Sequence, residues 1–117
     1  MLDTNSLIYA LNDQVKIPLE HYLVSIITEI ELLSYAKLTD SEDMMIRSML
    51  DRFEIVGLTA NIKKTTISIR KHFKVKLPDS IIVATAIENN ATLVTSDKQL
   101  LRLDSVDTIE LKNLKLT

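Results

Sequence analysis

The chain has 117 residues, a length typical of one domain, and is 46% hydrophobic and 26% charged. It has no cysteine, which excludes disulfides, thiolate chemistry and the usual structural zinc sites. No apolar run approaches the roughly 20 residues of a membrane span, and the net charge of −2 indicates no global affinity for nucleic acid. We therefore predict a single domain over residues 1–117, with no membrane partner and a reducing cytoplasm as its location.

The first half of the chain alternates β-rich and helical segments. Leu2 belongs to a very short first strand, which leaves open whether further residues precede Met1. We expect a helix over 6–11, a strand over 21–27 and helices over 28–38 and 39–53. The last of these opens with Thr39-x-x-Glu42, a capping-box pattern.

The second half continues the alternation. We expect a strand over 54–58, an amphipathic helix over 60–74, a helix over 79–90, a strand over 91–95, a helix over 98–103 and an edge strand over 108–111. The helix over 79–90 is almost uniformly apolar, which predicts burial on most sides, and Pro78 lies at or just before its start. This order predicts an α/β fold with a parallel sheet covered by helices.

Four acidic residues follow apolar runs, at or just inside predicted helix starts: Asp3, Glu31, Asp79 and Asp97. In a parallel α/β sheet the carboxyl ends of strands and the amino ends of helices share one edge, so these side chains are expected to converge. Convergent carboxylates repel one another and stay ionised only if something neutralises them. A hard divalent cation that prefers oxygen ligands, such as Mg²⁺ or Mn²⁺, is the natural candidate.

Four motifs carry these acids in order along the chain: LDTN at 2–5, SIITEIEL at 25–32, LPDSIIVATA at 77–86 and LVTSD at 93–97. Together they resemble the motifs of PIN domains, in particular the VapC-type toxins of bacterial and archaeal toxin–antitoxin systems. The sequence departs from that pattern in its short first strand and in Ser96, where many relatives have Asn or Arg. Neither departure removes an acidic residue.

The resemblance implies a three-layer PIN-like domain, with a central parallel sheet flanked by helices, that acts as a metal-dependent endoribonuclease. It implies that Asp3, Glu31, Asp79 and Asp97 are the catalytic metal ligands. Asn5 and Thr95 match the family's common polar neighbours. It also implies an RNA substrate, a homodimer and an antitoxin whose peptide covers the site.

Other interpretations of the acids remain open. A carboxylate near a helix start complements the helix dipole by about 0.3–1 kcal/mol, and Thr28-x-x-Glu31 is a good capping box. Two further functions also remain: a PIN nuclease that processes RNA without being a toxin, and a catalytically silent module for dimerisation or partner binding.

Residues 55–78 contain no acid but six cations: Lys63, Lys64, Arg70, Lys71, Lys74 and Lys76. This stretch is either a phosphate-binding surface that guides RNA toward the acids or the solvent-exposed face of an amphipathic helix. Its aromatic residue, Phe73, falls at an apolar position, so we do not expect base stacking there.

Methionines cluster in the helix predicted over 39–53. Met44, Met45, Met49 and Leu50 are expected to pack in the core, with an adaptable partner surface as the alternative.

Overall fold

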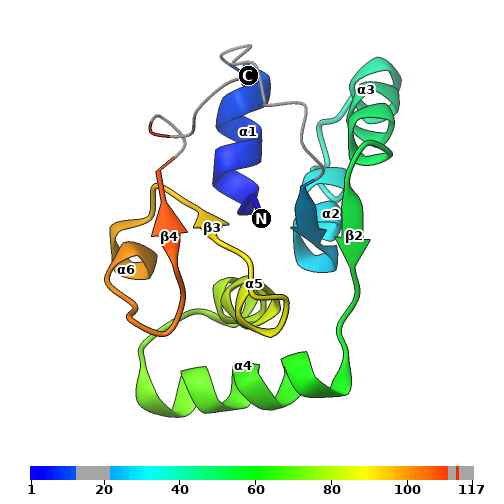
Figure 1. Ribbon diagram of the computed structural model, residues 1–117. Coiled ribbons are helices and arrows are strands. Elements are labelled where there is room, and N and C mark those ends of the chain that lie inside the picture. Colours follow the sequence, from blue (N-terminus) through cyan, green and yellow to red (C-terminus); the bar gives the residue numbers. More distant parts are fainter. Residues whose placement is uncertain (13–21, 111–112, 114–117) are drawn as a thin grey trace.

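The fold is seen in a computed structural model that describes residues 1–12, 22–110 and 113 (Figure 1). In chain order the elements are α1 (Thr4–Asn12), β1 (Leu23–Ser25), α2 (Ile26–Leu33), α3 (Asp40–Leu50), β2 (Glu54–Val56), α4 (Ala60–His72), α5 (Leu77–Glu88), β3 (Leu93–Val94), α6 (Lys98–Leu101) and β4 (Thr108–Ile109).

The described strands form a parallel arrangement in the order β2, β1, Leu2, β3, β4. β1 pairs with β2, β3 pairs with β4, and Leu2 forms parallel bridges to Val24 on one side and Val94 on the other. The Leu2 amide donates to the carbonyl of Leu23 at 3.3 Å, and the Asp3 amide donates to the carbonyl of Val94 at 3.1 Å. A very short central strand therefore joins the two pairs.

Alternate strand residues pack on opposite faces of the sheet, as the strand geometry requires. Val24 and Val94 join the core beneath α1 and α3, whereas Leu23 and Leu93 join the core that includes α5. In Figure 1, α1 and α3 lie above the strands, and α5 lies below them with α4 beneath it. This confirms the predicted α/β class with helices on both faces.

The predicted burial of the apolar helix is confirmed. Every residue of α5 from Ser80 to Ala86 is buried, because α5 lies between the sheet and α4. Pro78 lies in its first turn, as expected. Among the described residues, no helix is long and apolar enough to cross a membrane.

Several predicted boundaries were wrong. The strand predicted over 21–27 ends at Ser25, whose hydroxyl caps α2 by accepting the amide of Ile27 at 3.1 Å. The two isoleucines that read as β-branched strand residues therefore open the helix, and α2 ends at Leu33 rather than at position 38. His21, which began the strand predicted over 21–27, and Leu111, which ended the one predicted over 108–111, lie outside the described residues.

The capping box of α3 is confirmed. The core packing predicted for its apolar residues is confirmed for Met49 and Leu50 and was wrong for Met44 and Met45. Thr39 and Glu42 exchange both predicted hydrogen bonds. Met44 and Met45 are 71% and 56% exposed, whereas Ile46 and Leu50 turn into the core. The i, i+4 spacing of Ile46 and Leu50 defines the buried face.

We predict that two isoleucines of α4 differ sharply in their contribution to stability. Ile62 is 1% exposed and Ile67 is 50% exposed. Ile62→Ala should lower the free energy of unfolding by about 2–5 kcal/mol, and Ile67→Ala by less than about 0.5 kcal/mol. Urea unfolding measures both; equal losses would mean that α4 does not pack on α5 through the Ile62 face.

Candidate functional site

The four predicted acids lie at the carboxyl edge of the parallel strands. Asp3 follows Leu2, Asp97 follows β3, Asp79 lies in the first turn of α5, and Glu31 lies on α2. Residues from four separate segments therefore approach one another because the strands run parallel and end together.

The pKa of the Asp79 carboxyl reflects how close these acids lie to one another. Burial raises the pKa of the Asp79 carboxyl above its ordinary value, and the negative charges of Asp97, Glu31 and Asp3 raise it further, in that order. Lys76 acts in the opposite direction. Each of the other three acids is thus near enough to destabilise the ionised form of Asp79.

Two of the acids also cap helices, as the alternative interpretation expects. Asp3, which is 5% exposed, accepts the amide of Ser6 through Oδ1 at 2.8 Å, in the first turn of α1. Asp97 accepts the amide of Gln99 through Oδ1 at 2.8 Å and begins α6. In each case Oδ1 carries the cap bonds, and Oδ2 makes no hydrogen bond with a described residue, so capping holds both carboxylates in place without occupying that oxygen.

The capping interpretation of Glu31 was wrong. Because Ser25 caps α2, Glu31 lies in the second turn and not at the third helical position. The Thr4 hydroxyl donates to Glu31 Oε1 at 2.7 Å and lies 2.9 Å from the buried hydroxyl of Thr28. Sequence reasoning missed this role of Thr4 and Thr28, although Thr4 directly follows Asp3.

The two predicted polar neighbours differ in their surroundings. Thr95 is fully buried, and its hydroxyl accepts the amide of Asp97 at 3.1 Å, which orients the start of α6. Asn5 is exposed on α1. The structure gives Thr95 a positioning contact to an acid and gives Asn5 none among the described residues.

The donor chemistry fits a hard divalent cation, since carboxylate oxygens are the ligands that Mg²⁺ and Mn²⁺ prefer. Among the described residues, no three acidic or histidine side chains lie close enough together to hold a metal ion. Repulsion between ionised carboxylates favours larger distances between them when no metal is bound. The roles of these acids as metal ligands stay predictions.

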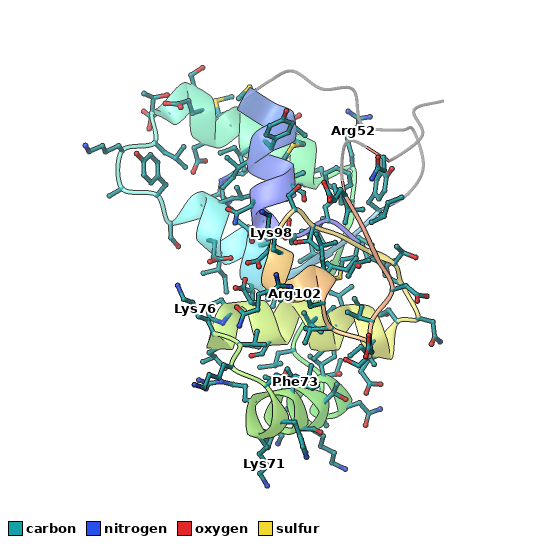
Figure 2. All side chains as sticks on the ribbon, turned by 90° about the vertical axis from the view of Figure 1, so that its left-hand side faces the viewer. Arg52, Lys71, Phe73, Lys76, Lys98 and Arg102 are labelled. Atoms are coloured by element: carbon teal, nitrogen blue, oxygen red, sulfur yellow. The ribbon has the colours of Figure 1, made fainter. Side chains whose placement is uncertain are left out.

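The six predicted cations are all exposed, on α4 or in the connection to α5. Four of them, Arg70, Lys71, Lys74 and Lys76, line a groove of about 770 Å³, whereas Lys63 and Lys64 do not. Figure 2 shows Lys71 at the outer side of α4 and Lys76 beside the start of α5. Phe73, predicted at an apolar position of the helix over 60–74, is 46% exposed and lines the same groove, because α4 ends at His72.

A family model described as "PIN domain" matches residues 1–106. A toxin–antitoxin complex from Klebsiella pneumoniae is similar at TM-score 0.74 and 29% identity, covering 94% of this chain and 98% of that one. VapBC2 from Rickettsia felis, bound to a promoter DNA fragment, is similar at 0.77 and 24%, with coverages of 94% and 98%. FitAcB from Neisseria gonorrhoeae is similar at 0.74 and 22%, with coverages of 97% and 98%.

These findings confirm the predicted resemblance to PIN domains of the VapC type and the predicted three-layer fold. Comparison with curated protein sequences gave no match. The extent of the domain, predicted as residues 1–117, stays a prediction.

We predict that Asp79→Asn stabilises the metal-free protein. Asp79 makes no hydrogen bond with a described residue, so the change removes repulsion without removing a cap. Its pKa is raised in the folded state, so the unfolded chain releases this proton first and parent stability falls as pH rises from about 4 through the folded pKa. The advantage of Asp79→Asn should therefore be largest near pH 7 and vanish toward pH 4.

Urea unfolding in EDTA at several pH values measures this advantage. Asp104→Asn removes an exposed carboxylate elsewhere and should change stability by less than about 0.5 kcal/mol at every pH. A loss of stability for Asp79→Asn at pH 7 would contradict the clustering of the four charges.

Proposed function

We propose that this chain, which belongs to the PIN domain family, is an endoribonuclease that uses Mg²⁺ or Mn²⁺ and is the toxin of a toxin–antitoxin pair. One observation supports the nuclease activity above the others: burial raises the pKa of the Asp79 carboxyl, and the charges of Asp97, Glu31 and Asp3, from three other segments, raise it further. A fold gains no stability from such repulsion, which is the arrangement expected where charge is needed for function.

Under this proposal Asp3, Glu31, Asp79 and Asp97 hold the metal. A bound Mg²⁺ or Mn²⁺ supplies an activated water at neutral pH and neutralises charge on the scissile phosphate. The chain contributes positioning: cap bonds hold Asp3 and Asp97, and the Thr4 hydroxyl holds Glu31. The Lys76 ammonium, which acts on Asp79, adds a positive charge at the rim for the RNA phosphate.

The antitoxin partner is proposed from two observations. Similar structures are toxin–antitoxin complexes. In addition, large apolar side chains are exposed on α1 to α3 and the turn that follows α2: Ile8, Tyr9, Ile30, Tyr35, Met44 and Met45. Because α1 and α3 both contact α2, exposed apolar side chains on these helices could together form an interaction surface. Met44 and Met45 thus fit the partner-surface alternative, whereas Met49 packs against the core. A homodimer is proposed from the resemblance, and sedimentation at several concentrations tests it.

Two alternatives stay open and differ in what they predict. A PIN nuclease that processes RNA would cleave without an antitoxin gene beside it, whereas a toxin gene should follow a small reading frame with a DNA-binding pattern. A silent module for dimerisation or partner binding would not cleave RNA with any metal.

We predict that purified protein cleaves RNA with Mn²⁺ or Mg²⁺ and is inactive in EDTA. Asp79→Asn and Glu31→Gln should each lower the cleavage rate by about 100-fold or more, because each removes a charge that holds the metal. The readout is the initial rate of cleavage of a labelled single-stranded RNA.

Asp104→Asn is the matched control and should cleave like the parent. Circular dichroism confirms that each variant is folded. Cleavage that persists in EDTA, or small losses at both Asp79 and Glu31, would contradict metal-dependent catalysis by these acids.

A further inference from the structure

A groove runs along the last turns of α4 and the connection into α5. Its volume is about 770 Å³. Its apolar lining includes Ile67, Phe73 and Leu77, which are 50%, 46% and 49% exposed. We call this feature the α4–α5 groove; its cations are Arg70, Lys71, Lys74 and Lys76.

The cations of the α4–α5 groove form no ion pair with a described residue, although Lys76 lies near the carboxylate of Asp79. The whole stretch 55–78 contains no acid. Exposed cations without partners attract a polyanion, and each phosphate they contact releases counterions. The charge of the groove therefore favours a nucleic acid strand as occupant.

The apolar lining indicates which form of nucleic acid fits. An exposed aromatic ring among cations is the combination that binds single strands, since bases stack on the ring while the cations hold the phosphates. Paired bases in an A-form duplex are not free to stack on a side chain. We propose that the α4–α5 groove binds single-stranded RNA, with one unpaired base stacked on Phe73. This inference rests on the proposed function, because it makes the groove the entry track of the substrate.

The α4–α5 groove ends near the acidic residues, since Lys76, which lines it, is three residues before Asp79. Lys76, at its end, lies close enough to Asp79 to act on that carboxyl. The Gln99 side chain donates a hydrogen bond to the Lys74 carbonyl, which links the groove to α6. Asp97 caps the first turn of α6. A strand whose base rests on Phe73 is thus led past Lys76 to the acids.

A second copy of this chain is the competing occupant. In a two-fold dimer the same surfaces face each other, so a contact through the groove would bring two rows of cations together. RNA removes that repulsion, which is why we favour it.

The test measures RNA binding separately from cleavage. Binding of a fluorescent single-stranded RNA is followed by anisotropy in EDTA, for the parent and Phe73→Leu, with an intact RNA and one carrying abasic sites. The parent should prefer the intact RNA by about tenfold, and Phe73→Leu should lose that preference. Because the preference is a ratio of two affinities measured on the same protein sample, an unfolded fraction of the variant does not change it.

A charge-matched pair of double variants tests the phosphate contacts. Lys71→Gln with Lys74→Gln should reduce the salt slope of binding by roughly 0.7 per lost contact, while Lys63→Gln with Lys64→Gln, outside the groove, should leave it near the parent value. Equal slopes for both pairs, or no preference of the parent for intact RNA, would overturn the proposal.

Two further outcomes are distinct. If Phe73→Leu abolishes a dimer without RNA and leaves RNA binding unchanged, the groove binds a second copy and the proposal fails. If the parent shows the base preference but never cleaves with Mn²⁺, the groove stands and the proposed nuclease activity fails.

Discussion

The pairing of Leu2 is the contact on which the rest of the arrangement depends. Within the described residues, Leu2 bridges to both Val24 and Val94 and so joins two strand pairs into one parallel surface. It is fully buried, and its position in the middle of the sheet puts the next residue, Asp3, between the segments that carry the other acids. A change that loosened Leu2 would therefore disturb the fold and the acidic site together.

Repulsion among the acids destabilises the fold, and the four acids differ in the hydrogen bonds that offset this repulsion. Asp3 and Asp97 offset part of it through cap bonds, worth about 1 kcal/mol each in comparable helices, and Glu31 receives the hydroxyl of Thr4. Asp79 has no such bond with a described residue, and its pKa is the one that burial and the other charges raise. The cap bonds of Asp3 and Asp97 use Oδ1, which leaves Oδ2 of each carboxylate available for the proposed metal.

Much of this could be predicted from sequence, and the failures have local causes. Apolar runs ending in acids predicted both the parallel class and the meeting of Asp3, Glu31, Asp79 and Asp97. The start of α2 was misplaced because Ile26 and Ile27 have strand propensity, while the cap that decides the boundary is the single hydroxyl of Ser25. The contact between Thr4 and Glu31 joins residues 27 positions apart, and no periodic pattern encodes it.

Under the proposed function, the distribution of charge explains how an acidic site could accept RNA, a polyanion. The net charge of −2 would repel RNA if it were spread evenly, but residues 55–78 contribute cations alone. They lie on α4, the outermost helix of its face, and lead to Lys76 beside Asp79. Under the proposed function, the place of a cation matters more than the total charge: Lys63 and Lys64 carry the same charge as Lys71 and Lys74 but do not line the α4–α5 groove.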